Sequence, residues 1–517
     1  MRRLVSTFAI VAILAQGPAV ANAEQERVGM PAPPWTASQC APLAPLPQLG
    51  AEQQQARPQN YRPVRRSEPG VAMSEATIAK GEGADASPPP PPPPPPPVMA
   101  APVSEAPVAT VASSAPSARA KSVSDSEAAS PTGRIMPYPH PMPPRPRPPR
   151  PQAGLLTAGE HDDMLNPELY ARYVRQSNLG QEIRALPVLD TSRVLTVAVK
   201  DDAGRAVPFA KVELACANGR TLTLNTLADG TVAFFPEVDR LSRKVRLRVG
   251  GEAWREVAIA PGAGGQRVDF TVGKAAQAVR KLDLMLVIDT TGSMGDELRF
   301  LQTELAAILE GLKARHRGLD LRIGFVFYRD LGDEYVTQTV PLTGDFAAAQ
   351  GTLSQQYASG GGDYPEAMDQ AMIRAAGQQW RPDAVHSLLL VADAPPHDDK
   401  FDTTWLAARH LRQQRVQIVP VAASGVADKA EYAMRAMAAL TQSRYTFLTD
   451  DSGIGNPHAP PAIDCYLVTR LDALLRRVID SQLSGRRIEP DKSEVIRTVG
   501  QYDSGRCIIP PGGLQDQ

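Results

Sequence analysis

The stretch LMLVIDTTGSMGDEL, residues 284–298, places oxygen-bearing side chains directly after five apolar residues. Asp289 is followed by hydroxyl side chains at alternate positions, Thr291 and Ser293. Carboxylate and hydroxyl oxygens are the ligands that a hard divalent cation such as Mg²⁺ takes in proteins. The pattern therefore indicates a cation site at the end of a buried strand.

Two further acids end apolar stretches later in the chain, Asp330 after GFVFYR and Asp393 after LLLVA. Four stretches are apolar on both faces, as in parallel strands covered by helices: 284–288, 323–328, 387–392 and 416–422. Ligands bind at the carboxyl ends of such strands, so we expect all three acids at one rim of a doubly wound α/β sheet. Crowded carboxylates repel unless a cation or a proton neutralises them.

The spacing D-x-[ST]-x-S after an apolar strand resembles the metal-ion-dependent adhesion site of von Willebrand factor A (VWA) domains, over residues 281–485. The resemblance implies a Rossmann-like, mostly parallel sheet. It also implies that Asp289, Thr291 and Ser293 bind Mg²⁺ or Mn²⁺ directly or through water, and that Asp393 adds a water-mediated contact. One coordination position is then left for an acidic residue of a partner protein.

The segment SGGGDYPEAMDQAM is closer to the integrin β-subunit version of this site. That likeness places Glu366 on the metal, and it places Asp363, the Pro365 carbonyl and Asp330 at a neighbouring Ca²⁺ site. Gly361 stands where the integrin version has a side-chain amide, which weakens the second site.

Asp296 and Glu297 have the spacing of the integrin's adjacent metal site, but acids in a first helical turn are stabilised by the helix dipole in any case. We therefore treat them as a weak adjacent site. The segment ADAPPHDD also resembles the A domain attached to slime-mould alpha-kinases, although no kinase part is visible.

An enzymatic reading starts from DTTGS, which fits the D-x-T-G-[ST] of aspartyl-phosphate pumps with Asp289 as nucleophile. Those pumps need membrane helices, and related phosphatases place an acid where Thr291 stands. The chain also lacks G-x-x-x-x-G-K-[ST]. We expect a binding protein and no enzyme; the alternatives are a structural VWA module with a degenerate metal site and a metal-dependent phosphate hydrolase.

Composition restricts the partners and the compartment. With 55 basic and 56 acidic residues, no net field favours nucleic acid. Residues 1–23 combine two arginines, an apolar run and a small-x-small site, which predicts a signal peptide and export. We expect periplasmic residence, with secretion or an uncleaved anchor as alternatives, and no transmembrane segment in the mature chain.

Residues 24–153 contain a ten-proline run and predict a disordered tether or, alternatively, a proline-rich ligand. Residues 154–189 predict a short helical linker, with His161, Asp162 and Asp163 in a solvated entry loop or, alternatively, at a metal.

Residues 190–275 show short alternating strands separated by turn signals, which predict a small antiparallel β-sandwich. VKDDAGRAVPFAKVEL and TLADGTVAFF resemble the carboxypeptidase-regulatory-like sandwich family. Cys216 shares its face with Val212 and Leu214, which predicts a buried thiol.

The tail, residues 486–517, is too polar and short to dock by burial alone. We therefore predict a disulfide between Cys465 and Cys507, with Cys40 free or intermolecular. Four cysteines formally allow three pairings.

Overall fold

A computed structural model describes residues 39–52, 156–177, 179, 189–262, 264–452, 458 and 460–509. The predicted signal peptide (1–23) and most of the predicted tether (24–153) lie outside the described residues. Within the described ranges, no helix combines the length and the apolar character that a membrane span requires.

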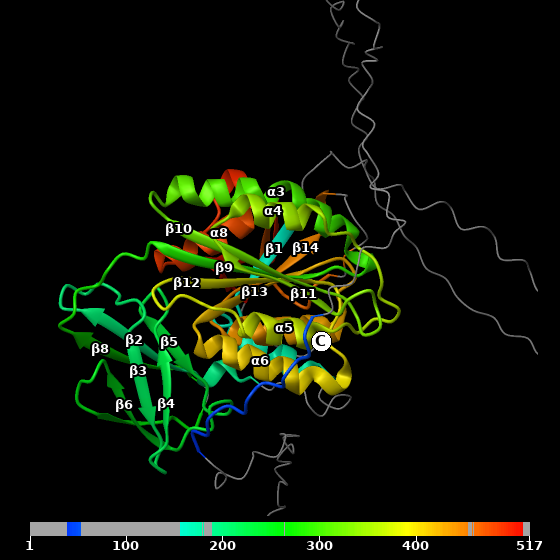
Figure 1. The fold of residues 1–517 in the computed structure, drawn as a ribbon. Helices are drawn as coiled ribbons and strands as arrows, with labels where there is room; N and C mark the ends of the chain where they lie inside the picture. Colours follow the sequence, from blue (N-terminus) through cyan, green and yellow to red (C-terminus); the bar gives the residue numbers. More distant parts are fainter. Residues whose placement is uncertain are drawn as a thin grey trace, which may run out of the picture. The chain divides into compact units, whose positions relative to one another are not determined.

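A nine-stranded sheet has the order β11-β10-β9-β12-β13-β14-β1-β15-β16 (Figure 1). The five strands from β10 to β14 in this order are parallel, and the other neighbouring pairs are antiparallel. The strands are β1 (Thr157–His161), β9 (Lys281–Asp289), β10 (Asp320–Tyr328), β11 (Thr337–Thr343), β12 (Val385–Ala392), β13 (Val416–Ala422), β14 (Tyr445–Thr449), β15 (Tyr466–Arg470) and β16 (Arg497–Val499).

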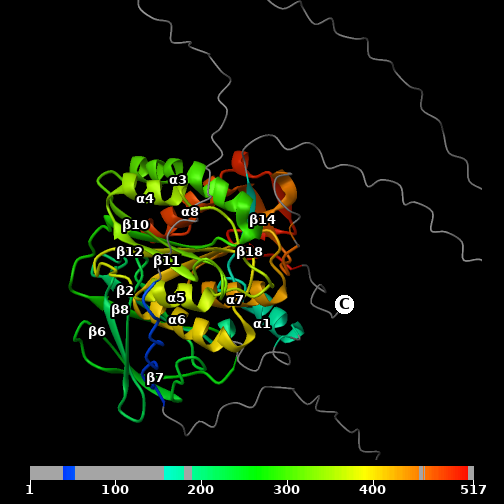
Figure 2. The same ribbon diagram turned by 45° about the vertical axis from the view of Figure 1, so that its right-hand side comes forward.

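Helices cover both faces of this sheet. One face carries α3 (Gly295–Arg315), α4 (Phe346–Ser354) and α8 (Leu471–Ser484), and the other carries α1 (Pro167–Gln176), α5 (Met368–Ala376), α6 (Phe401–Gln413) and α7 (Asp428–Leu440) (Figures 1 and 2). Strand β9 contributes Leu284 and Leu286 to one core and Met285 and Val287 to the other. The predicted doubly wound, mostly parallel α/β sheet is confirmed.

Strand β1 corrects the predicted entry loop before α1. All five residues of β1 are buried, and the strand pairs antiparallel with both β14 and β15. Its Glu160 lies between Arg444, at 2.8 Å, and Arg477, at 3.1 Å. Burial alone would raise the pKa of Glu160, but the two guanidinium groups outweigh it and lower the pKa to about 2.

The turn after β1 is also anchored by buried charge. Asp163 is 2% exposed and receives hydrogen bonds of 3.0 and 2.7 Å from Arg435 of α7. Arg435 also contacts Glu431 at 3.1 Å and stacks over the Tyr173 ring at 3.9 Å. Asp163 is therefore neither solvated nor a free metal ligand, because it neutralises a buried arginine.

Residues 195–272 form two smaller sheets, which we call the two-sheet region. The sheets have the orders β5-β2-β8 and β4-β3-β6-β7, and their apolar residues form one core. The pair β2 and β8 is parallel, which differs from the expected all-antiparallel arrangement. The strands are β2 (Leu195–Asp201), β3 (Lys211–Ala215), β4 (Thr221–Asn225), β5 (Thr231–Phe234), β6 (Lys244–Val249), β7 (Arg255–Ala258) and β8 (Gln266–Val272).

The two-sheet region is joined to the helices of the large sheet by polar contacts. Arg412 of α6 donates hydrogen bonds to Asp239, at 2.8 Å, and to the Ala233 carbonyl, at 2.6 Å. The Gln442 side chain accepts from the Ala233 amide at 2.8 Å. These contacts hold the two regions together at the α6 side.

Residues 39–52, which we call the strap, do not behave as part of a tether. A disulfide joins Cys40 to Cys216, so neither the predicted buried thiol nor the predicted free cysteine is present. At the other end, Glu52 accepts from the Thr339 amide at 3.0 Å and contacts Arg374 at 3.3 Å. The strap thus runs from the two-sheet region to the edge strand β11.

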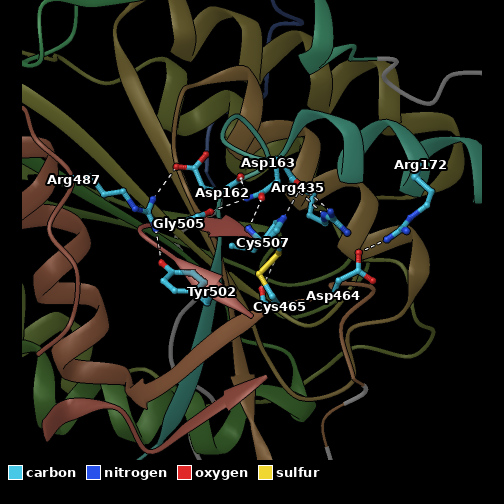
Figure 3. The surroundings of a disulfide bond; sticks show 12 residues. Asp162, Asp163, Arg172, Arg435, Asp464, Cys465, Arg487, Tyr502, Gly505 and Cys507 are labelled. Carbon is cyan, nitrogen blue, oxygen red and sulfur yellow. Dashed lines mark hydrogen bonds and ion pairs between the residues drawn. A yellow bond between two sulfur atoms is a disulfide. The ribbon is translucent and has the colours of Figure 1, made fainter. Parts of the chain in front are cut away.

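The C-terminal tail docks through a disulfide between Cys465 and Cys507, the pair that the sequence suggested (Figure 3). Its hairpin of β17 (Tyr502–Asp503) and β18 (Arg506–Cys507) meets Asn166, which donates to the Gly505 carbonyl at 2.8 Å and accepts from the Cys507 amide at 2.8 Å. Asn166 therefore makes no side-chain cap on α1.

The strap predicts an unusual proteolysis pattern. The composition of residues 53–155 predicts protease sensitivity, with trypsin sites such as Lys80 and Arg134. After limited trypsin digestion, the fragment that carries Cys40 should stay attached to the core on a non-reducing gel and separate on a reducing gel. The paired variant Cys40→Ser/Cys216→Ser should release it without reductant. Release from the wild type without reductant would contradict the disulfide.

Candidate metal and partner site

The strand register brings the predicted acids to one end of the sheet. Asp289 is the last residue of β9 and pairs with Tyr328 of β10, so Asp330 lies two residues beyond this level. On the other side of β9, Val391 pairs with Ile288, so Asp393 also lies beyond its strand. We call this end, with the loops that follow β9, β10, β12 and β13, the rim.

The Asp289 carboxylate is buried with one oxygen satisfied and one without a partner. Its Oδ1 accepts hydrogen bonds from the Thr291 amide, at 2.9 Å, and the Thr291 hydroxyl, at 2.7 Å. The Thr291 hydroxyl lies 3.4 Å from that of Ser293, which is exposed. Among the described residues, Asp289 Oδ2 is buried without a hydrogen-bond partner, and so is the Tyr328 hydroxyl on the neighbouring strand, although this hydroxyl is close enough to lower the pKa of Asp289.

Glu366 reaches the rim from the loop before α5. Its amide donates to the Pro395 carbonyl at 3.0 Å, so its loop lies on the segment that follows Asp393. Glu366 Oε2 is buried and has no hydrogen-bond partner. Gly361 lies against Glu366 and Thr291: a Cβ there would sit 2.9 Å from Glu366 Oε1 and 3.2 Å from Thr291 Cβ. With φ of +72°, this position favours glycine for both reasons.

The carboxylates at the rim disturb one another. Burial, and then the charge of Asp393, raise the pKa of Asp289 to about 7. Burial, and then the charges of Asp289, Asp330, Asp333 and Asp393, raise the pKa of Glu366 to about 9. Burial also raises the pKa of Asp393 to about 6, although a hydrogen bond from the Ser293 hydroxyl opposes the shift. The carboxylates of Asp289, Glu366 and Asp393 therefore lack enough nearby positive charge to be ionised together.

Backbone contacts hold the two key loops together. The Gly292 amide donates to the Gly360 carbonyl at 3.1 Å, and the Ser359 amide donates to the Thr290 carbonyl at 3.0 Å. The Thr290 hydroxyl in turn donates to the Tyr328 carbonyl at 2.8 Å. The loop that leads to Glu366 is therefore positioned by the loop that carries Thr291 and Ser293.

Asp330 has a partner that sequence reasoning missed. His397 Nε2 lies 2.7 Å from Asp330 Oδ1, and the Asp330 amide donates to Asp333 Oδ2 at 3.1 Å. Asp333 also accepts from the Gly361 amide at 2.9 Å, whereas Asp363 is exposed. Asp333 is the second of three acids in the loop DLGDE, and this run of acids was the only sequence signal for it.

The side chains of Asp296 and Glu297 contact other residues of this chain. Asp296 pairs with Arg299 one turn along α3. Glu297 Oε1 accepts from the Ser424 amide, at 3.1 Å, and hydroxyl, at 2.8 Å. The Ser424 hydroxyl lies 3.0 Å from His458 Nε2, which extends the network to the loop after β14.

The carboxylate oxygens at the rim could bind a hard cation only together with the hydroxyl groups of Thr291 and Ser293. In the described ranges, no three side chains from His, Cys, Asp and Glu converge as a metal-binding group. The unpartnered oxygens Asp289 Oδ2 and Glu366 Oε2, with the hydroxyl groups of Thr291 and Ser293, are the available donors. These four residues could hold Mg²⁺ or Mn²⁺.

Comparison with known proteins identifies the domain. The family model described as von Willebrand factor A domain matches residues 283–455. Alpha-protein kinase vwkA of Dictyostelium discoideum is 30% identical over 132 residues, which are 25% of this chain and 21% of that protein. The chain thus spans about a fifth of the length of this curated relative.

Two solved structures show weaker likeness. The pilus adhesin SpaC from Lactobacillus rhamnosus GG, in its open conformation, is 13% identical, with a TM-score of 0.31 over 40% of this chain and 30% of the adhesin chain. The SpRpn10 VWA domain is 14% identical, with a TM-score of 0.25 over 35% of this chain and 88% of that domain. The family match and the sheet that carries it identify residues 283–455 as a von Willebrand factor A domain.

Proposed function

We propose that this VWA domain binds Mg²⁺ or Mn²⁺ at the rim and, through the cation, an acidic residue of a partner protein. The observation that carries the proposal is that Asp289 Oδ2 and Glu366 Oε2 are both buried and have no hydrogen-bond partner in the described part of the chain. Leaving buried polar atoms unsatisfied is costly, and a cation between them would remove that cost.

Each rim residue has a role in this proposal. Asp289 and Glu366 supply charge, and Thr291 and Ser293 supply neutral oxygens. Asp393 would not bind the cation directly. It would orient Ser293, because its carboxylate accepts a hydrogen bond from the Ser293 hydroxyl. The cation would supply a positive field at the open coordination position, which attracts the partner's carboxylate.

A second, Ca²⁺ site at Asp330, Asp363 and Pro365 would share Asp330 with His397, whose Nε2 lies 2.7 Å from Asp330 Oδ1, and it would include the exposed Asp363. At the weak adjacent site, Glu297 Oε1 is bonded to Ser424 and Asp296 is paired with Arg299, so only Glu297 Oε2 is buried without a hydrogen-bond partner among the described residues. We therefore assign the proposed function to the first site alone.

We propose an exported, non-catalytic protein, in keeping with its two disulfides, which persist in oxidising compartments. The periplasm is the proposed location. The alternatives are a VWA domain whose rim holds no metal and a phosphate hydrolase; the first binds a partner despite chelation, and the second turns over phosphate esters.

The function is tested by capturing partners from envelope extract on immobilised protein, with Mg²⁺ or with chelator. We expect Thr291→Ala to lose Mg²⁺-dependent capture by about tenfold or more, because the cation loses a neutral ligand. Glu366→Thr should keep or strengthen capture, since one negative charge leaves the shell and the cation attracts the partner's acid more strongly. Equal capture by all variants, or capture that survives chelation, would place the partner elsewhere.

Metal binding is tested separately by thermal unfolding. A ligand that binds only the folded state at a hundredfold excess over its Kd adds about 2.7 kcal/mol of stability. Millimolar Mg²⁺ should therefore raise the Tm of chelator-stripped protein by several degrees, and Asp289→Ala should abolish the rise. An unchanged response in Asp289→Ala would refute this assignment.

The stripped protein should also show a characteristic pH dependence. Glu366, Asp289 and Asp393 have folded pKa values of about 9, 7 and 6, above those of unfolded carboxyl groups. The folded state then binds more protons than the unfolded state, so stability falls as pH rises from about 4 to 9. In chelator, the Tm should fall across this range, and Asp289→Asn should flatten the decline. A Tm that rises from pH 5 to 8 would contradict the charge crowding.

A further inference from the structure

Large exposed apolar side chains are rare in the described residues: Leu331, Tyr364, Ile496 and Ile508. Leu331, at 53% exposure, belongs to the rim loop after β10, and Tyr364, at 41%, belongs to the loop before α5 through which Glu366 reaches the rim. Exposed apolar groups gathered at one place mark interaction sites more often than chance exposure. Their position relative to the unpartnered carboxylate oxygens therefore carries information about the partner.

Tyr364 spans from the Glu366 loop to the loop after β13. Its hydroxyl accepts from the Ala427 amide at 2.7 Å and lies 3.4 Å from the Gly425 carbonyl. A Cβ added at Gly425 would lie 3.8 Å from Asp393 Oδ2, so this loop lies close to Asp393. The ring is thus fixed at the β13 side of the candidate metal site.

Leu331 lies on the opposite side of the same site. It follows Asp330 in the loop after β10, and the hydrogen bond from His397 to Asp330 anchors the start of this loop. Asp333 anchors the loop to the Gly361 amide, beside Glu366. In the sheet order, the loop of Leu331 after β10 and the loop after β13 that Tyr364 contacts therefore lie on either side of β9 and β12, whose ends carry Asp289 and Asp393.

The order of the strands in the sheet sets the distance between the loop after β10, which carries Leu331, and the loop after β13, which Tyr364 contacts. Strands β10 and β13 are three positions apart, with β9 and β12 between them. At about 4.8 Å per strand, this separation is about 14 Å. An extended chain covers that length in about four residues, and its residues i, i+2 and i+4 share one face.

We propose that the partner presents an extended segment of the form apolar-x-acid-x-apolar, with its acid at the cation and its two apolar side chains against Leu331 and Tyr364. This inference rests on the proposed function and names the class of partner. A protein segment can supply both features at this spacing. An acidic polysaccharide would supply the carboxylate without the apolar side chains.

The probe is a displayed peptide library with a central Asp and three random residues on either side, selected on the whole protein with Mg²⁺ or with chelator. In Mg²⁺, we expect apolar residues to be enriched about tenfold at positions −2 and +2 relative to the Asp, because each would bury apolar surface. Chelator should remove the enrichment.

Variants of Leu331 and Tyr364 show which of the two peptide positions each side chain contacts. Leu331→Ser should lose the preference at one position and Tyr364→Ser at the other, whereas Tyr364→Phe, which keeps the ring, should retain it. The matched control is Ile496→Ser, because Ile496 is 51% exposed but precedes β16 at the opposite edge of the sheet. Every variant must keep the Mg²⁺-induced rise in Tm, which shows that the fold and the metal site are intact.

The outcomes separate this inference from the proposed function. Mg²⁺-dependent retention of Asp peptides without any preference at positions −2 and +2 would overturn the inference and leave the proposed function standing. Retention that ignores Mg²⁺ or the central Asp would overturn both. Leu331-dependent retention of immobilised polyuronate would assign the flanks to an acidic polysaccharide and also overturn the inference.

Discussion

Repulsion among buried carboxylates at the rim is the constraint on which the rest of the molecule depends. Asp289 cannot be moved away, because it is the last residue of the central strand β9, which is hydrogen-bonded to β10 and β12. The surrounding loops place hydroxyl groups and His397 against these carboxylates, but among the described residues three carboxylate oxygens, Asp289 Oδ2, Glu297 Oε2 and Glu366 Oε2, have no hydrogen-bond partner. The stability of the domain is thereby coupled to whatever neutralises the rim.

The chain secures this domain at positions remote from the rim. Strand β1 inserts between β14 and β15 with a buried glutamate between two arginines. The strap and the tail are each held by a disulfide, at Cys216 and at Cys465. Because Glu52 also bonds the edge strand β11, the described residues 39–52 belong to the same folded unit as the two-sheet region and the large sheet.

Local sequence predicted those parts of the site that depend on strand ends. Asp289, Asp330 and Asp393 follow runs that are apolar on both faces, and parallel strands necessarily bring their ends together. Local sequence could not predict side-chain partners across loops. Glu297 bonds to Ser424, and Asp330 bonds to His397, through contacts between residues far apart in the chain.

By itself, the sequence determined the α/β class and the oxygen-rich strand end, because periodicity and local chemistry are enough for these. It suggested the Cys465–Cys507 pair but left three pairings of the four cysteines open. Only the tertiary structure decided that β1 joins the sheet, that Cys40 pairs with Cys216 across 176 residues, and that the Tyr364 hydroxyl reaches the Ala427 amide. These features depend on which distant segments meet, and that is set by burial and charge compensation over the whole fold, to which no local pattern is sensitive.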